Sequence, residues 1–93
     1  MNERAIKGIV VDAGHGGADP GAMANGLKEK DLNLKAAQYM YQRLQELGIP
    51  TTIVRGTDET VDRDERVRRI LDAYGDDPNV IVISNHINAG GDN

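Results

Sequence analysis

The sequence predicts an α/β fold in which three strands alternate with two helices, in the order βαβαβ. Three observations predict it: three short apolar runs rich in Ile and Val, two amphipathic stretches between them, and turn-forming residues at the junctions. Strands joined by helices of about 12 residues or more pair in parallel through right-handed crossovers. We therefore expect a three-layer arrangement, with a mainly parallel sheet and helices packed on it.

The predicted strands are the three apolar runs. Residues 5–11 form the first, which stops at Asp12, where a loop begins. Residues 50–55 form the second, ahead of the turn-prone segment 56–58. Residues 80–83 are an unbroken β-branched run, which is typical of a strand covered on both faces. In the common arrangement of such sheets the first and third strands are neighbours.

The predicted helices are residues 31–47 and about 62–74. The first has apolar residues at three- and four-residue spacing and is followed by a glycine, which is a C-terminal stop signal. The second carries a similar stripe, and Asp62 with Glu65 supplies its N-terminal cap. Ahead of the first helix, five Gly and one Pro among residues 14–26 predict a long loop without regular structure.

Length and composition limit the class of protein. Ninety-three residues make one domain at most, and 39% hydrophobic with 28% charged residues is a globular rather than a disordered balance. A formal net charge of -4 repels phosphate backbones and argues against nucleic acid as the partner. No apolar run approaches the ~20 residues of a membrane span. Residues 1–7 lack the apolar stretch of a signal peptide.

The chain's two histidines both fall at predicted carboxyl ends of strands. His15 lies among glycines after the first strand, and His86 follows the third. Because the carboxyl ends of parallel strands share one edge of the sheet, where α/β proteins bind their ligands, we expect the two imidazoles to lie close together. A lone His is usually a satisfied surface or core residue, so their joint placement is the evidence. Cysteine is absent, so a metal site needs His and carboxylate ligands.

Three carboxylates could complete such a site, since zinc hydrolases commonly hold the ion with two His and one carboxylate. Asp12 follows the first strand, and could instead accept the free ring N–H of His15. Asp19 lies in an Asp-Pro-Gly sequence, which forms turns by itself. Glu29 lies just ahead of the first predicted helix, where the helix dipole favours an acid in any case. Residue types and spacing leave the third ligand open.

Four motifs follow one another along the chain. They are Val-Val-Asp-Ala-Gly-His-Gly-Gly-Ala-Asp-Pro-Gly at 10–21, Lys-Glu-Lys-Asp-Leu-Asn-Leu at 28–34, Arg-Gly-Thr-Asp at 55–58 and Ser-Asn-His-Ile-Asn at 84–88. In this order they resemble the zinc-dependent N-acetylmuramoyl-L-alanine amidases of cell-wall autolysins and phage endolysins. The resemblance covers essentially the whole of residues 1–93, but only the amino-terminal part of that family's single catalytic domain.

The resemblance implies a zinc site made by His15, Glu29 and His86. In the family these are the His of the Gly-His-Gly-Gly motif, the Glu ahead of the first helix and the His after the third strand. It also implies hydrolysis of the amide bond between N-acetylmuramic acid and the L-alanine of the peptidoglycan stem peptide, and therefore action on the cell wall. Without a signal peptide, the chain fits a phage endolysin or an excised domain of an exported autolysin.

Further positions correspond to the family's motifs. Arg55 and Asp58 match its Arg-x-x-Asp element, and Arg66 matches an Arg on the second helix. We expect a mainly structural role for them, such as a loop-bracing ion pair. Asp12 is expected to lie around the metal ligands, and Asn88 matches an Asn that either braces the loop or hydrogen-bonds a peptide.

One catalytic group of the family has no counterpart in this sequence. The family's catalytic domains are nearly twice this length, and their last strand ends in a second Glu that acts as general acid and base. We therefore expect the chain alone to bind zinc but to cleave weakly, since loss of general acid–base help costs ~10²- to 10⁴-fold. The third strand leaves an open sheet edge, so we expect a homo-oligomer or pairing with the remaining half of the domain.

Two alternatives belong to other functional classes. A non-catalytic interaction or wall-binding fragment would keep the zinc as a structural pin. A nucleotide- or phosphate-binding α/β module would use residues 14–21 as a phosphate cradle. The glycine spacing there fits neither the dinucleotide nor the Walker pattern, which makes this the weaker alternative.

Overall fold

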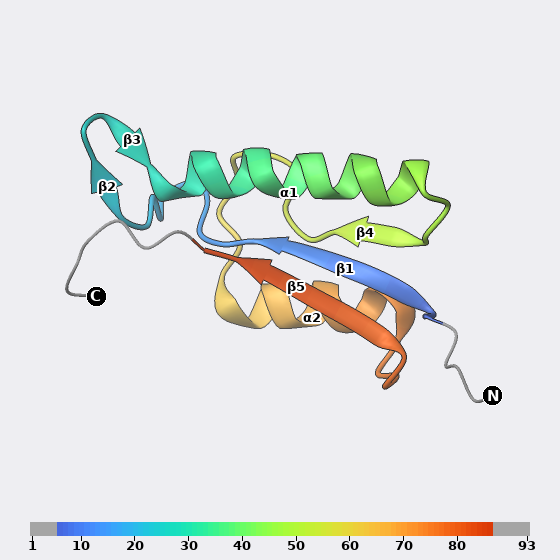
Figure 1. Cartoon of the computed structure of the whole chain (residues 1–93). Coiled ribbons are helices and arrows are strands. Elements are labelled where there is room, and N and C mark those ends of the chain that lie inside the picture. The colour runs from blue at the N-terminus through green and yellow to red at the C-terminus, as the bar shows by residue number, and fades with distance from the viewer. Residues whose placement is uncertain (1–5, 87–93) are drawn as a thin grey trace.

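The computed structural model describes residues 6–86 and shows an α/β fold of three layers (Figure 1). Its elements are β1 (Gly8–Ala13), β2 (Met23–Ala24), β3 (Leu27–Lys28), α1 (Glu29–Glu46), β4 (Thr51–Ile53), α2 (Arg63–Tyr74) and β5 (Val80–Asn85). The main sheet has the order β4-β1-β5, and both pairings are parallel. The helix α1 covers one face of this sheet and α2 lies on the other. The predicted fold class and the adjacency of the first and third strands are confirmed.

The core is centred on β1, the middle strand. All six residues of β1 are buried. Its alternate residues Ile9, Val11 and Ala13 pack with Ala37 of α1, because successive side chains of a strand point to opposite faces. On the other face Gly8 lies against the ring of Tyr74, the last residue of α2. The continuous apolar run of the first strand therefore reflects burial on both faces.

The strand β5 is less covered than its β-branched sequence predicts. Its burial alternates between intermediate and exposed, and Ile81 and Val82 are 43% and 44% exposed. Within residues 6–86, β5 is an edge strand, whereas both helices pack against the central strand β1. The expectation of a strand covered on both faces is therefore wrong for the described part of the chain, because a β-branched run indicates a strand but not its neighbours.

The segment 14–26 contains regular structure that the sequence analysis did not predict. The strands β2 and β3 pair antiparallel around Asn25 and Gly26, which have φ values of 52° and 78°. Positive φ at both central residues is the signature of a tight two-residue hairpin turn, for which Asn-Gly is a preferred sequence. The hairpin runs directly into α1, which therefore begins at Glu29 rather than at residue 31. Glu29 is thus the first helical residue, not one ahead of the helix.

The second helix matches its predicted bounds, whereas the first two strands differ from theirs at the ends. The second helix is capped as expected, with the Asp62 side chain accepting a hydrogen bond from the backbone N–H of Glu65 at 2.8 Å. The second strand is shorter than predicted, spanning residues 51–53. The first strand spans Gly8–Ala13, so its predicted end at residue 11 is two residues too early, because Asp12 continues the pairing with β5. Its predicted first residue, Ala5, lies outside the described residues.

Candidate metal centre

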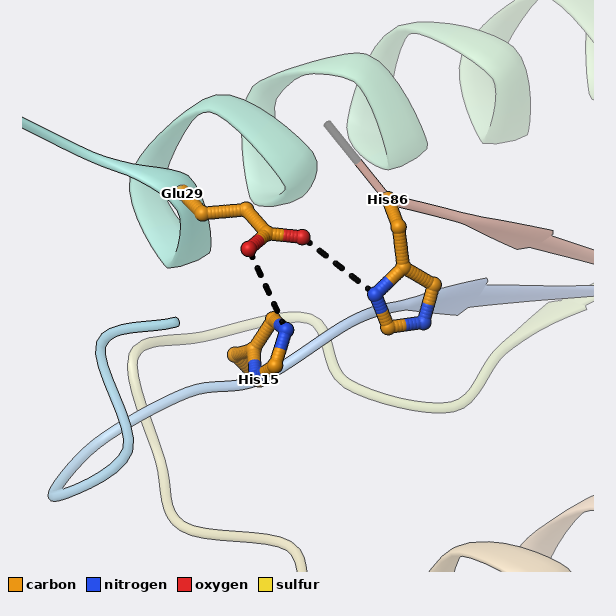
Figure 2. Close-up of side chains that lie close together, drawn as sticks. All are labelled: His15, Glu29 and His86. Atoms are coloured by element: carbon orange, nitrogen blue, oxygen red, sulfur yellow. Dashed lines mark hydrogen bonds and ion pairs between the residues drawn. The ribbon is translucent and has the colours of Figure 1, made fainter. Parts of the chain in front are cut away.

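Three side chains converge at the carboxyl ends of β1 and β5. His15 follows β1, His86 directly follows β5, and Glu29 opens α1. Each offers a ligand atom, and these atoms all lie within 4.8 Å of one another. Figure 2 shows the Glu29 carboxylate above the two rings, with one oxygen directed to each imidazole. The prediction that the two histidines meet at one edge of the sheet is confirmed.

The Glu29 carboxylate is the best-held group of the cluster. Its Oε1 lies 3.3 Å from Nε2 of His15, and its Oε2 lies 3.3 Å from Nδ1 of His86. The backbone N–H of Ala22 donates to Oε1 at 3.0 Å, and the side-chain amide of Asn33 donates to Oε2 at 3.3 Å. The residue is only 7% exposed and stands at a helix N-terminus, where the dipole favours a carboxylate. The Glu29 carboxylate is therefore held in place by groups of the chain itself.

The ring of His15 is oriented by a second carboxylate, that of Asp19. Nδ1 of His15 lies 2.8 Å from Oδ2 of Asp19, while Oδ1 accepts from the backbone N–H of Gly21 at 3.1 Å. The hydrogen bond to His15 is the main cause that lowers the pKa of Asp19 below its ordinary value. The backbone of His15 has φ 64°, a left-handed conformation that costs a non-glycine residue of order 1–3 kcal/mol and is concentrated at functional sites.

Two glycines make room for the cluster. A Cβ on Gly14 would lie 2.5 Å from Cε1 of His86, so the imidazole occupies the space above this glycine. A Cβ on Gly21 would lie 2.6 Å from Oε1 of Glu29 and 2.7 Å from Cδ2 of His15. Gly21 also has φ +68°, which favours glycine. The glycine-rich loop therefore fits closely around all three candidate ligands.

The chemistry of the three residues fits a divalent zinc ion. Two imidazole nitrogens and one carboxylate oxygen are a common ligand set of catalytic zinc sites, with metal–ligand distances of about 2.0 to 2.2 Å. Both Glu29 oxygens face ring nitrogens at 3.3 Å, so the acidic group and the two imidazoles point toward a common centre. The His side chains are 27% and 54% exposed, which leaves the cluster open to solvent on the histidine side.

Asp12 takes a different place from the one suggested by the sequence. It is 4% exposed within β1, and its carboxylate accepts hydrogen bonds from Arg66 and from the hydroxyl of Ser84, the latter at 2.9 Å. The carboxylate on the free ring nitrogen of His15 is that of Asp19. Asp12 therefore supports the cluster indirectly, by holding Arg66 against the loop that carries His15.

Arg66 and Arg55 both brace the loop that carries His15. Arg66 donates to the carbonyl oxygens of Ala13 at 2.7 Å and His15 at 3.2 Å. Arg55 is fully buried and donates to the carbonyl oxygen of Gly14 at 3.1 Å. Its other acceptors are the carbonyl oxygens of Lys30, Thr57 and Ala13. Burial lowers the pKa of Arg55. The expected loop-bracing role fits these contacts, although the hydrogen bonds of Arg55 go to carbonyl groups rather than to Asp58.

Asp58 braces the same loop through another partner. It accepts from the backbone N–H of Gly17 at 2.8 Å and from Lys30 Nζ at 3.0 Å. The hydrogen bond from Lys30 is the main cause that lowers the pKa of Asp58. Lys30 also donates to the carbonyl oxygen of Gly17 at 2.9 Å, and is buried. The loop is therefore tied to both α1 and the segment that follows β4.

Asn33 is a site residue that the sequence analysis missed. It is fully buried and its amide group donates both to Glu29 and, at 3.1 Å, to the carbonyl oxygen of Gly14. The available signal was its spacing, because Glu29, Asn33 and Ala37 lie at four-residue intervals on the buried side of α1. Asn88, the other polar residue expected near the site, lies outside the described residues.

Comparison with known proteins identifies the family. A sequence profile of the N-acetylmuramoyl-L-alanine amidases matches residues 9–93. The chain belongs to this amidase family. The amidase CwlM of Bacillus licheniformis is 38% identical over 85 residues, which cover 89% of this chain and 32% of CwlM. The endolysin of Bacillus phage SPP1 is 37% identical over 82 residues, which cover 87% of this chain and 29% of the endolysin.

Two solved structures share the fold of this chain. The amidase AmiC2 of Nostoc punctiforme superposes with a TM-score of 0.81 at 27% identity, covering 98% of this chain and 49% of AmiC2. Cwp6 from Clostridium difficile superposes with a TM-score of 0.81 at 34% identity, covering 92% of this chain and 13% of Cwp6. The chain therefore spans less than half the length of each of these four relatives.

Proposed function

We propose that this chain forms the zinc-binding half of a peptidoglycan hydrolase. The bond cleaved is the amide between N-acetylmuramic acid and the L-alanine of the stem peptide. One observation carries the proposal: His15, Glu29 and His86 converge at the ligand-binding edge of an α/β sheet in a member of the amidase family. The names of CwlM and AmiC2, which state this activity for those proteins, support the same substrate.

Residues of the chain have three separate roles at the proposed site: binding the metal, positioning Glu29 and bracing the His15 loop. His15, Glu29 and His86 would hold the zinc, and Ala22 and Asn33 donate hydrogen bonds to the Glu29 carboxylate that position it for this role. When bound, zinc lowers the pKa of its water toward ~7 and polarises the scissile carbonyl group. Arg55, which is buried, and Arg66, which is partly buried, brace the His15 loop by donating to its carbonyl oxygens.

General acid–base catalysis is the part of the reaction that we assign outside this chain. The family resemblance implies that a second Glu, after the last strand of the domain, provides this catalysis. The chain spans less than half the length of the relatives above. We infer that the 93 residues alone cleave ~10²- to 10⁴-fold more slowly than a whole domain.

The place of action follows from the substrate. We infer that the chain works on the bacterial cell wall, either as part of a phage endolysin or as a domain of an autolysin, because relatives of both kinds match it. No helix among residues 6–86 is both long enough and apolar enough to cross a membrane.

A structural zinc pin in a non-catalytic wall-binding fragment is the second candidate. His86 separates the two functions, because its ring is half exposed and its interactions within residues 6–86 are with Glu29 and His15 of the cluster. For a structural pin, His86→Ala abolishes folding measured by circular dichroism. For a catalytic site, the variant stays folded and loses zinc-dependent cleavage.

An assay on purified cell walls tests the proposed activity directly. The chain, alone and fused to the remaining half of the CwlM catalytic domain, is incubated with walls in the presence of zinc. We expect new amino-terminal L-alanine from both proteins, more slowly from the chain alone, and none after chelation or with His86→Ala. Release of reducing sugar ends instead, or cleavage that His86→Ala leaves unchanged, would contradict the proposal.

A further inference from the structure

We infer that Asp19 is a positioning residue that sets which ring nitrogen of His15 is free to bind the metal. This inference rests on the proposed zinc site and adds a residue to it. Oδ2 of Asp19 lies 2.8 Å from Nδ1 of His15, whereas Nε2 of the same ring faces the Glu29 carboxylate at 3.3 Å. One ring nitrogen is therefore occupied by Asp19 and the other points into the cluster.

The hydrogen-bonding capacity of the two groups fixes the proton. An ionised carboxylate only accepts hydrogen bonds, so Nδ1 of His15 must donate to Asp19 and carry the ring proton. A neutral imidazole carries one such proton, which leaves Nε2 with a free lone pair. Metal ions bind the unprotonated nitrogen, and a carboxylate on the opposite N–H is the usual way in which proteins orient a metal-binding His.

Asp19 is itself held in the geometry that this role requires. Its second oxygen, Oδ1, accepts from the backbone N–H of Gly21 at 3.1 Å, and its backbone N–H and C=O exchange hydrogen bonds with Gly16 at 2.9 and 2.8 Å. The side chain is 62% exposed, so the loop does not need it to fill a core. Its two oxygens have separate functions: Oδ1 closes the turn and Oδ2 orients the ring.

The substitution Asp19→Asn separates these two functions. An amide keeps Oδ1 as the acceptor for the Gly21 N–H, which places its NH₂ group where Oδ2 faced His15. An NH₂ group only donates, so Nδ1 of His15 must now accept and the ring proton moves to Nε2. The turn is preserved, but the ring proton now lies on Nε2, the nitrogen of His15 that would bind the metal. Rotating the amide would bring its NH₂ group against the Gly21 N–H, which is unfavourable.

Asp72→Asn is a charge-matched control for this variant. Asp72 lies on α2, its side chain is 65% exposed, and it pairs with Arg68 of the same helix at 2.9 Å. Each substitution removes one negative charge and keeps the side-chain shape, but only Asp19 contacts the ring of a proposed ligand. Differences between the two variants therefore report the contact with His15 rather than the loss of a charge.

The first measurement is zinc affinity, determined by competition with a chromophoric chelator. We expect Asp19→Asn to bind zinc ~10- to 100-fold more weakly than the unchanged chain, the usual loss for a disturbed partner of a metal ligand. We expect Asp72→Asn to stay within about threefold of the unchanged chain, because it leaves the ring proton of His15 where it was. Equal losses in both variants, or no loss in Asp19→Asn, would overturn the inference.

The second measurement needs no metal. Ring-nitrogen NMR locates the proton of the neutral His15 ring in metal-free Glu29→Ala, which removes the competing carboxylate. We expect the proton on Nδ1 there and on Nε2 in Glu29→Ala with Asp19→Asn. A proton that stays on the same nitrogen refutes the inference. If the unchanged chain bound no zinc, the proposed metal site would fail, while this measurement would still decide the role of Asp19.

Discussion

Gly14 shows how a single missing side chain shapes the proposed site. The imidazole of His86 lies directly over its Cα, in the space that a Cβ would occupy. The backbone of Gly14 also leads into His15 and is held by Arg55 and Asn33 through its carbonyl oxygen. The position therefore combines a fixed backbone with room for a half-exposed ring.

We expect Gly14→Ala to weaken zinc binding without unfolding the chain. The new methyl group would lie 2.6 Å from Nδ1 of His86, and the ring, which is 54% exposed, can swing into solvent at little cost. The loss should be at least about tenfold in zinc affinity, because a ligand rather than its partner is displaced. Gly56→Ala is the control, since its Cβ meets no atom closer than 3.6 Å. Equal zinc affinities for the two variants would contradict this account of Gly14.

At the residue scale the sequence predicted the proposed ligands, which the structure brings together, better than the residues that support them. The two histidines followed from strand order, because residues at carboxyl ends of neighbouring parallel strands must share an edge. Glu29 followed only from family resemblance, since Asp12 and Asp19 are also near that edge. The role of Asp19 on the His15 ring depends on a four-residue turn whose geometry composition does not reveal.

The helix α2 carries none of the proposed ligands but braces the loop that carries His15. Its N-terminus is capped by Asp62, and Arg66 in its second turn reaches the carbonyl oxygens of the His15 loop. Glu65 beside it pairs with Arg68 at 2.6 Å and with Arg69 at 2.7 Å. These pairs hold the first turns of the helix from which Arg66 extends.

We expect the contribution of Glu65 to stability to disappear in acid. Its hydrogen bond from Arg68, the main cause, lowers the pKa of Glu65 from 4.5 to about 2. A lowered pKa in the folded state means that the ionised form favours folding. The contribution is therefore complete above about pH 4.5 and is lost as the pH falls toward 2.

Urea unfolding of the unchanged chain and of Glu65→Gln measures this effect. The unchanged chain should be the more stable at pH 7, and the two should converge by about pH 2 as its carboxylate is protonated. Because the Glu65 side chain is partly exposed, at 31%, added salt should also reduce the difference at pH 7. A difference that stays constant from pH 7 to pH 2 would show that the ion pairs do not stabilise the helix.

Among the elements, long periodic segments were predictable and short ones were not. The stripes of α1 and α2 repeat over several turns, so the existence of both helices could be inferred. The hairpin of β2 and β3 has two residues in each strand, too few for a periodic signal, although Asn25-Gly26 is a recognisable turn sequence. The start of α1 was misplaced because this hairpin leads directly into the helix.

The whole molecule presents an uncovered strand at one edge of its sheet. In the order β4-β1-β5 the outer side of β5 has no partner strand among residues 6–86. Ile81 and Val82 on this strand are more than two-fifths exposed. Edge strands of this kind pair readily with other chains. We therefore propose that β5 pairs either with a second copy or with the remaining half of the domain.

We expect the chain alone to self-associate through β5. Size-exclusion chromatography with light scattering should show a concentration-dependent dimer. Val82→Lys should shift it toward monomer, because a charged side chain on an edge strand discourages pairing. Val67→Lys on α2 is the control, since Val67 is similarly exposed, at 48%, but lies away from the edge. A monomer at every concentration would exclude pairing between copies.

The sheet order could be predicted from the alternation of strands and helices, because right-handed crossovers restrict the arrangement. The extent to which other elements cover β5 could not be predicted, because an apolar strand sequence does not say what packs against it. The candidate site lies at the carboxyl ends of β1, whose burial could be predicted, and of β5, whose partial covering could not.

Zinc content of the purified chain tests the central claim most directly. The unchanged chain and His86→Ala are loaded with zinc, dialysed against metal-free buffer and examined by elemental analysis. We expect about one zinc per unchanged chain and much less than one in His86→Ala, because the variant lacks one of the three ligands. An unchanged chain without zinc, or a variant that retains as much as the unchanged chain, would contradict the proposed metal centre.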